Sequence, residues 1–150
     1  MLGLAKRKIE ESYKEIKQKP ENIYITRYDI DRILNIFSPE DKIGRIYINF
    51  CNPWPRGKHH KKRLTHTRQL EKYKQFLEKD GCIYFKTDDD NLFTDSLTYF
   101  KEAGFDLEKV TYNLAEEKDF WNGEENIETE HEKMFKEQGI KIKAAIAKNK

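Results

Sequence analysis

Residues 45–55 read "RIYINFCNPWP", an apolar run that ends in a proline-rich turn. The run from Arg45 to Phe50 has apolar residues on both faces, which is typical of a central strand of a parallel sheet. The two prolines beside Trp54 restrict three successive backbone conformations, so we expect a rigid turn where the strand ends. Ligands of open α/β sheets bind beyond the carboxyl ends of their strands. The stretch therefore predicts both a sheet and the edge of that sheet where a site lies.

Strand-like and helix-like segments alternate on both sides of this stretch. We expect helices over residues 2–17, 29–37, 70–81 and 92–104, and strands over residues 22–26, 45–50, 82–87, 109–114 and 140–146. With 150 residues, the chain is long enough to bury one core. The pattern predicts a single α/β domain over residues 1–150, with a mostly parallel sheet and an antiparallel C-terminal strand.

Positive charge is concentrated in one part of the chain. The formal net charge is only +2, but residues 42–70 contain eight Lys and Arg and no Asp or Glu. A focused positive charge is typical of a protein that binds a polyanion. The run could instead be a solvated surface, but the width of the acid-free window favours contacts with phosphates.

Several protein classes are disfavoured by the remaining composition. The cysteines, Cys51 and Cys82, lie in or beside apolar runs, so we expect buried reduced thiols in a cytoplasmic protein. No apolar run is long enough to cross a membrane, and residues 1–16 do not resemble a signal peptide. The His59–His60 pair lacks the spacing of a zinc site, so no metal is expected.

Polar residues follow most of the expected strands and are candidates for a site. Asp29 follows the strand at 22–26, Asn52 follows the strand at 45–50, and Asp88 follows the strand at 82–87. Residues 129–132, which include Glu130 and Glu132, lie near the last strand. Each candidate also has a structural interpretation, because Asp caps helices and Asn occupies turns.

Three motifs in this order resemble one family, the bacterial tRNA (guanine-N7-)-methyltransferases, which use S-adenosylmethionine. The family's central motif reads approximately N-F-x-D-P-W-P-K-x-R-H-x-K-R-R-L-T, and residues 49–65 read "NFCNPWPRGKHHKKRLT". The strand and acid element is "FKTDDDNLF" at residues 85–93, and the C-terminal T-E-(Y/H/F)-E element is "TEHE" at residues 129–132. Together the motifs and the strands around them cover about residues 20–146.

The resemblance implies a seven-stranded, mostly parallel, Rossmann-like methyltransferase sheet, of which this chain supplies the later part. The family's first strand, with its glycine-rich turn, has no counterpart in the sequence, and neither has its second strand. The chain is therefore expected to be a methyltransferase domain that is truncated at its N-terminus, with an unpaired apolar sheet edge. The sequence leaves open whether a second copy covers that edge in a homodimer.

The resemblance also implies roles for individual residues. Asp29 and Asn52 would bind the cofactor, S-adenosylmethionine, and Asn52 would also lie beside the transferred methyl group, where the family often has aspartate. The guanine substrate would be bound by Arg56, Asp88, Thr129, Glu130, His131 and Glu132. The tRNA backbone would be contacted by Lys58, His59, His60, Lys61, Lys62, Arg63 and Arg68.

The sequence thus predicts a tRNA (guanine-N7-)-methyltransferase. Guanine N7 already carries a lone pair, so methylation requires alignment with the methyl donor and no general base. Two alternatives stay open at this point. The chain could be an inactive tRNA-binding fragment of such an enzyme, or a different α/β protein that binds nucleic acid.

Overall fold

The computed structural model describes residues 2–16 and 19–150, and it divides the chain into two compact units, residues 1–33 and 34–150. The first unit contains α1 (Leu2–Glu15), which confirms the helix expected near the N-terminus, although residue 17 of the expected range lies outside the described residues. Within this unit, α1 and the segment around Ile23 and Ile25 line one shallow hollow.

The strand expected at residues 22–26 is not formed. Residues 23–29 have no regular secondary structure, and the side chains of Ile23, Tyr24 and Ile25 are 39%, 92% and 38% exposed. Their β-branched and aromatic character favours a strand. However, a strand needs a neighbour for its N–H and C=O groups, and the described residues of this unit offer none.

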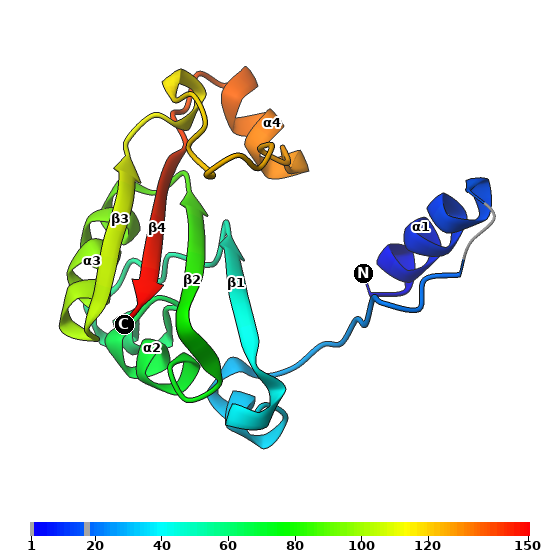
Figure 1. Cartoon of the computed structure of the whole chain (residues 1–150). Coiled ribbons are helices and arrows are strands. Elements are labelled where there is room, and N and C mark those ends of the chain that lie inside the picture. The colour runs from blue at the N-terminus through cyan, green and yellow to red at the C-terminus, as the bar shows by residue number, and fades with distance from the viewer. Residues whose placement is uncertain (1, 17–18) are drawn as a thin grey trace. The chain divides into compact units, whose positions relative to one another are not determined.

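The second unit is built on a four-stranded mixed sheet (Figure 1). Its strands are β1 (Ile43–Asn49), β2 (Leu77–Thr87), β3 (Phe105–Thr111) and β4 (Lys143–Asn149), in the order β1-β2-β4-β3. Strand β1 pairs with β2 in parallel, whereas β4 runs antiparallel to both of its neighbours. The α/β class and the antiparallel C-terminal strand are therefore confirmed. Strand β1, expected to be central, is an edge strand among the described residues, as the expected unpaired edge requires.

Helices and short 3-10 turns connect the strands. They are η1 (Ile30–Asn35), η2 (Pro39–Asp41), η3 (Gly57–Lys62), α2 (Thr67–Tyr73), α3 (Asp90–Glu102), η4 (Leu114–Glu116) and α4 (Glu130–Glu137). The helix expected at 70–81 was wrong in its second half, because residues from Leu77 onward join β2 beside β1. Gly81 is needed there, since a Cβ atom would lie 2.9 Å from the Glu78 carbonyl oxygen.

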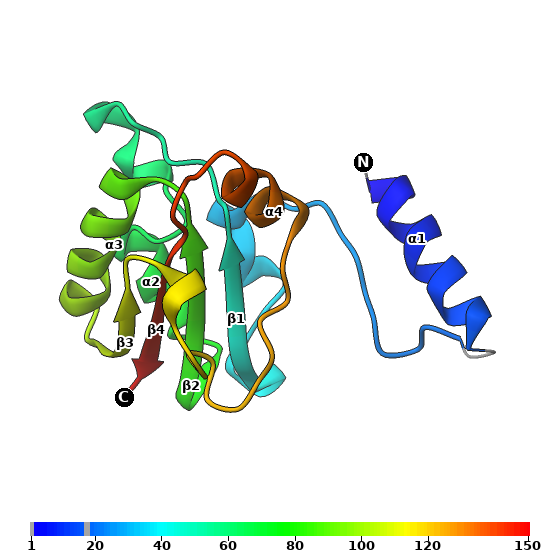
Figure 2. The ribbon, with the colours of Figure 1, turned by 90° about the horizontal axis from the view of Figure 1, so that it is seen from above.

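Helices α2 and α3 lie together on one face of the sheet (Figure 2). Fully buried Phe85 on β2 stacks with Phe93 of α3, which confirms the helix expected at residues 92–104. Helix α3 begins after the cap residue Asp89 and is followed by Gly104. On the opposite face, residues 114–121 cover the sheet through a second buried cluster, in which Tyr84 and Trp121 stack. Alternate residues of β2 therefore serve two different cores.

Both C-terminal strands lie away from their expected positions. Strand β3 begins four residues before the expected 109, and β4 begins three residues after the expected 140. Strand β4 lies between two neighbours and is buried on both faces, so its apolar alternation carries no information about register. Residues 130–132 form the first turn of α4.

Candidate functional site

The proline turn after β1 is held in a strained conformation beside the end of β2. Phe50 and Trp54 have positive φ angles of 53° and 43°, which side chains other than glycine adopt rarely. The N–H of Phe50 donates to the carbonyl oxygen of Lys86 on β2 at 2.9 Å. Such strain persists only where the surroundings impose it, and it is common at functional sites. The turn is therefore fixed at the carboxyl ends of two parallel strands.

Asn52 lies exposed within this turn. Its side-chain oxygen accepts a hydrogen bond from the N–H of Trp54 at 3.0 Å. The interaction is that of a turn residue, so this structural interpretation of Asn52 holds. The N–H₂ group of Asn52 is a donor that it can offer to a ligand. That donor suits the oxygen atoms of an amino acid or a ribose.

The ring of Trp54 packs against the residues that follow it. His59 lies edge-on to the ring at 5.7 Å, and the ammonium of Lys62 lies 4.8 Å from the ring centroid. The cation of Lys62 is attracted to the π-face of the tryptophan. Trp54 thus anchors the start of residues 56–68, here called the basic segment. This segment contains η3.

Most charges of the basic segment face solvent. Arg56, Lys58, Lys61, Lys62 and Arg68 are exposed, and both His59 and His60 are half-buried. These residues are accessible to a polyanion, as the sequence predicted. Their contact with a nucleic acid remains a prediction.

Arg63 departs from the surface role that the sequence suggested for it. Its side chain is 1% exposed, and its guanidinium donates to the Pro53 carbonyl oxygen at 2.8 Å and to Asp95 at 2.6 Å. A third hydrogen bond, of 3.2 Å, reaches the Tyr99 hydroxyl on α3. A buried guanidinium with these partners is not available to a phosphate. Arg63 instead ties the proline turn to α3.

His66 caps α2 at the end of the basic segment. Its Nδ1 atom accepts a hydrogen bond from the N–H of Arg68 at 3.1 Å. Burial, together with the charge of Arg68, lowers the pKa of His66 below its ordinary value of 6.5. The imidazole is therefore neutral at pH 7, as its role as an acceptor requires.

Asp88 lies at the carboxyl end of β2 beside the proline turn. The neighbouring Asp89 caps α3 by accepting from the N–H of Leu92 at 2.7 Å. The capping role considered for Asp88 therefore belongs to Asp89. Asp88 is half-buried, and its carboxylate has no hydrogen-bond partner within the described part of the chain. It remains available to accept hydrogen bonds from a ligand.

Helix α4 brings residues 129–132 to the same edge of the sheet (Figure 1). The Thr129 hydroxyl caps the helix by accepting from the N–H of Glu132 at 3.1 Å. His131 is exposed and stacks on Phe50 of the proline turn, with ring centroids 6.1 Å apart. Glu130 is also exposed. The proline turn, Asp88 and the start of α4 are therefore brought together, as the sequence predicted.

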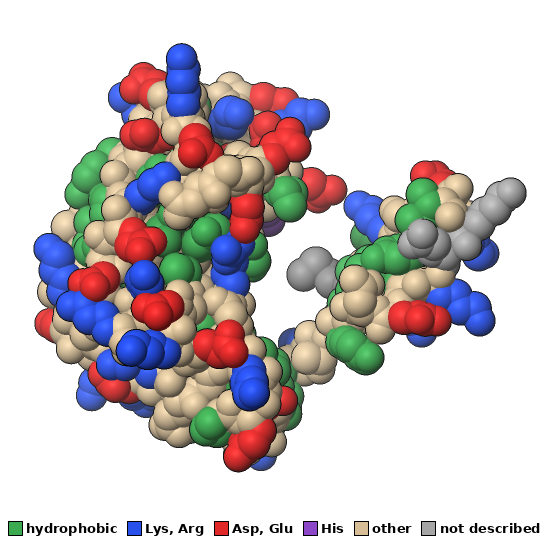
Figure 3. All heavy atoms as spheres, viewed as in Figure 1, with side chains coloured by type: hydrophobic (Ala, Val, Ile, Leu, Met, Phe, Trp, Pro, Cys, Tyr) green, Lys and Arg blue, Asp and Glu red, His purple; other side chains and the backbone are tan. Residues whose placement is uncertain are grey.

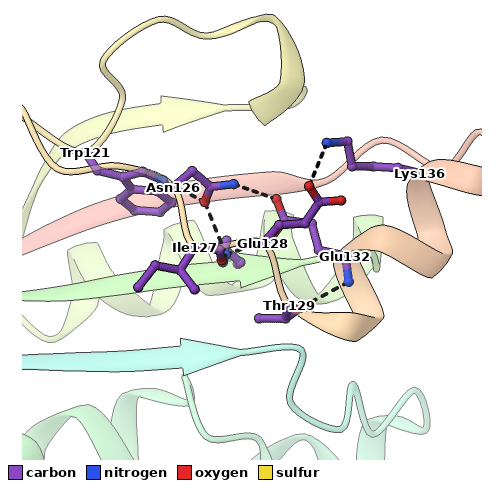
Figure 4. Close-up of polar contacts among 8 residues, drawn as sticks. Trp121, Asn126, Ile127, Glu128, Thr129, Glu132 and Lys136 are labelled. Carbon is purple, nitrogen blue, oxygen red and sulfur yellow. Dashed lines mark hydrogen bonds and ion pairs between the residues drawn. The ribbon is translucent and has the colours of Figure 1, made fainter. Parts of the chain in front are cut away.

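Glu132 is buried and differs from its neighbours. It is 2% exposed, and its carboxylate accepts from Lys86 Nζ at 2.8 Å. The carboxylate also accepts from Asn126 Nδ2 at 2.9 Å (Figure 4). Asn126 in turn accepts from the Trp121 indole N–H at 3.1 Å. Both oxygens of Glu132 are thus engaged by neighbouring side chains.

A cavity of about 310 Å³ opens beside this network on the face of the sheet opposite α2 and α3. Its walls include Tyr47 and Tyr84 from the sheet, and Trp121, Asn126 and Thr129 from the region that leads into α4. Hydrophobic side chains remain visible among charged ones on this face (Figure 3). Tyr47, for example, is 58% exposed.

The other predicted groups are placed as follows. Asp29 belongs to the first unit, where its carboxylate accepts from the N–H of Asp31 at 3.0 Å, close to the start of η1. Both cysteines are free thiols, and burial raises the pKa of Cys51 to about 11, which keeps it protonated and unreactive. The described residues contain no group of three or more His, Cys, Asp and Glu that could hold a metal ion.

The sequence interpretation missed Lys86, Asn126 and Trp121. Lys86 occurs in an otherwise apolar strand, "CIYFKT", and a lysine at such a position rarely lies buried without a partner. That signal predicts a buried acidic partner but does not identify it. Asn126 and Trp121 lie in an acidic region of irregular structure, where no pattern singles them out.

The strand order and the helices packed on the sheet define an α/β protein with a four-stranded mixed sheet. A chain in the solved complex of the Haloferax volcanii Trm112 methyltransferase activator with a methyltransferase has this fold. It matches with a TM-score of 0.52 and 11% identity, over 89% of this chain and 65% of that chain.

None of the described helices is long and apolar enough to cross a membrane.

The chain belongs to the family described as "Putative methyltransferase", whose model matches residues 2–145. The tRNA (guanine-N(7)-)-methyltransferase of Clostridium beijerinckii is 57% identical over 147 residues, which are 98% of this chain and 65% of the relative. The enzyme of the same name from Clostridium perfringens strain 13 is 52% identical over 99% of this chain and 66% of the relative. The chain thus spans about two thirds of the length of these curated relatives.

Proposed function

We propose that this chain forms the substrate-binding part of a tRNA (guanine-N7-)-methyltransferase that uses S-adenosylmethionine. One geometric observation carries the proposal. The turn at Asn52, the available carboxylate of Asp88 and the start of α4 lie at one edge of the sheet, beside the exposed charges of the basic segment. The names of the relatives that are 57% and 52% identical support the same reaction.

The residues present fit both the cofactor and the base. When bound, S-adenosylmethionine supplies an electrophilic methyl group. The N–H₂ of Asn52 would donate to the cofactor. Asp88 would accept hydrogen bonds from N1–H and N2–H₂ of guanine, whose Watson–Crick edge presents these donors. Holding the base in this way fixes the direction of the N7 lone pair. The exposed lysines of the basic segment would bind tRNA phosphates.

Asn52 affects the rate through charge. Guanine becomes positively charged as N7 is methylated, and a carboxylate near the ring would stabilise that charge. An amide can orient the reactants but offers no negative charge. The penalty lies between zero and about 3 kcal/mol, the value of one preorganised polar contact. Asn52 therefore permits the reaction.

The test joins this chain to the parts of the Clostridium beijerinckii relative that it does not span. The joined protein is incubated with unmodified tRNA and methyl-labelled S-adenosylmethionine, and N7-methylguanine is measured by mass spectrometry. We expect methylation, and we expect Asp88→Asn to lower kcat/KM by at least about 100-fold, because an amide cannot accept from both guanine donors in the same way.

Asp106→Asn is the matched control, since Asp106 is an exposed aspartate at the opposite end of the sheet. It should leave the rate within about twofold, as exposed substitutions usually do. Binding of tRNA without any product would refute the proposal and support a binding role alone.

A further inference from the structure

Lys86 and Glu132 form a buried ion pair between the sheet and α4. Lys86 is 5% exposed and Glu132 is 2% exposed, and their charged atoms lie 2.8 Å apart. Lys86 lies two residues before Asp88, near the carboxyl end of β2, and Glu132 lies in the first turn of α4. The pair therefore joins two elements that carry candidate substrate contacts.

The three donors of Lys86 and both oxygens of Glu132 have partners within the protein. Lys86 Nζ donates to Glu132 at 2.8 Å, to the Ile127 carbonyl oxygen at 3.0 Å and to Asn126 Oδ1 at 3.3 Å. These are the three donors of an ammonium group. Glu132 receives Lys86 on one oxygen and Asn126 on the other. This arrangement directs the carboxylate to Lys86 and Asn126 and leaves it 2% exposed.

Helix α4 depends on this pair for its position. It has eight residues, which is too short for a helix to be stable in isolation, and Glu132 is its single buried residue. The helix also contacts Phe50 of the proline turn through the half-buried Phe135 and the exposed His131. The network also fixes Trp121 through Asn126, as the dashed lines of Figure 4 show, and both residues line the cavity of about 310 Å³.

The Thr129-to-Glu132 spacing makes this use of the glutamate notable. A threonine cap followed three residues later by glutamate normally forms a capping box, in which the carboxylate turns back to the N–H of the cap residue. Here Thr129 caps the helix, but the carboxylate of Glu132 is directed to Lys86 and Asn126. The carboxylate of Glu132 therefore forms contacts with Lys86 and Asn126 instead of the capping-box hydrogen bond within α4.

We propose that Lys86 and Glu132 are positioning residues, which hold α4 so that Thr129 and His131 lie over the carboxyl ends of β1 and β2. The inference rests on the proposed methyltransferase function for its activity readout. It removes Glu132 from the groups that touch guanine, and it adds Lys86, to which the sequence motifs give no role.

A positioning role and a substrate-contacting role of Glu132 predict different activities when Glu132 and Lys86 are replaced together. Activity recovers if Glu132 only positions α4, and it stays lost if Glu132 contacts the substrate. Removing one member of a buried pair strands the other charge, whereas replacing both with apolar residues of similar size is often tolerated. The variants are therefore Glu132→Leu, Lys86→Met and the two together. Asn126 is exposed, so water can replace the hydrogen-bond partners that its side-chain amide loses in the double variant.

The measurements use the joined protein of the preceding subsection, with kcat and KM for tRNA determined separately. We expect each single variant to lower kcat by at least about 100-fold, as expected when reacting groups are displaced by about 1 Å. The double variant should recover to within about tenfold of the unaltered protein. Folding is checked by circular dichroism and thermal denaturation.

The matched control is the exposed pair between Glu128 and Lys136, which lies in the same region at 3.5 Å with side chains 41% and 43% exposed. Glu128→Leu with Lys136→Met should change kcat by less than about twofold, because exposed pairs contribute little. A double variant of the buried pair that is unfolded, or as inactive as Glu132→Leu alone, would overturn the proposal. The second result would show that Glu132 itself contacts the substrate.

Hydrogen exchange separates this inference from the proposed function. In the 150-residue chain, exchange over residues 121–137 should rise by at least about tenfold in each single variant and return in the double variant, because local opening follows the loss of buried contacts. If the unaltered joined protein makes no N7-methylguanine, the proposed function fails, but hydrogen exchange still tests whether Lys86 and Glu132 hold α4 in place. Unchanged exchange in the single variants would overturn that positioning role.

Discussion

The basic segment (residues 56–68) and the acidic segment (residues 116–132) have opposite charges, but in both of them a single charged side chain is buried while its charged neighbours are exposed. Each looks like a solvated surface by composition, and each contains one buried charged residue among exposed ones, Arg63 and Glu132. Arg63 fixes the proline turn to α3, and Glu132 fixes α4 to β2. The comparison teaches that a run of charges can contain both the groups that meet a ligand and the groups that hold the site together.

The two buried charges differ in the exposure of their partners. Asp95, the partner of Arg63, has a side chain that is 42% exposed, whereas Lys86, the partner of Glu132, is 5% exposed. A carboxylate left without Arg63 can be hydrated, but an ammonium left without Glu132 cannot. We therefore expect loss of Arg63 to cost less than loss of Glu132.

The largest effect expected within the basic segment is that of Arg63→Ala. The substitution removes the hydrogen bond to Pro53 and the ion pair with Asp95, and it should lower the free energy of unfolding by about 3 kcal/mol. Urea denaturation of the 150-residue chain measures this. Arg63→Lys should recover little, because a single ammonium cannot reproduce the geometry of the guanidinium.

Lys61→Ala is the control for Arg63, since Lys61 is exposed two residues earlier in the same segment. It should change the free energy of unfolding by less than about 0.5 kcal/mol. Equal stability of the two alanine variants would remove the distinction between buried and exposed charges in this segment.

The second effect concerns the exposed charges and their affinity for tRNA. The logarithm of the association constant for tRNA falls as the logarithm of the salt concentration rises. Replacing Lys58 and Lys61 with alanine should make this slope less steep by about 2, because each phosphate contact contributes about 0.9. Filter binding of tRNA to the 150-residue chain at several salt concentrations measures the slope. The exposed residues Lys79 and Lys101, replaced together, provide a charge-matched control outside the segment. The same reduction in both double variants would mean that only net charge matters.

The smallest effect is a pH dependence that originates at His66. Its pKa is lowered in the folded protein, so the unfolded chain binds the proton more readily and stability falls as the pH drops below about 6.5. His66→Asn keeps a cap residue that does not titrate. The urea midpoint of this variant should therefore decrease less between pH 7.5 and pH 5.5 than that of the unaltered chain. The difference should not exceed the ~1 kcal/mol that a helix cap contributes. Parallel curves for the two proteins would exclude His66 as the source.

Local patterns predicted much of the fold. The run at 45–50, the strand at 82–87 and the helix that begins after Asp89 all form close to their expected positions. The strand expected at 22–26 does not form, because its propensity is satisfied only when another strand lies beside it. The prediction for 70–81 was wrong in part for the converse reason, since pairing with β1 extends β2 back to Leu77.

For the candidate site, the sequence by itself determined which segments meet and which charges are present. Parallel strands end at the same edge of a sheet, so residues after β1 and β2 had to lie together, and the motif order identified the family. Only the tertiary structure decided which charged side chains are buried. Arg63 and Glu132 differ from their neighbours by the presence of Asp95 and Lys86, which are 32 and 46 residues away along the chain. A charge can be buried only where a partner offsets its desolvation, and that partner is supplied by the packing of distant elements.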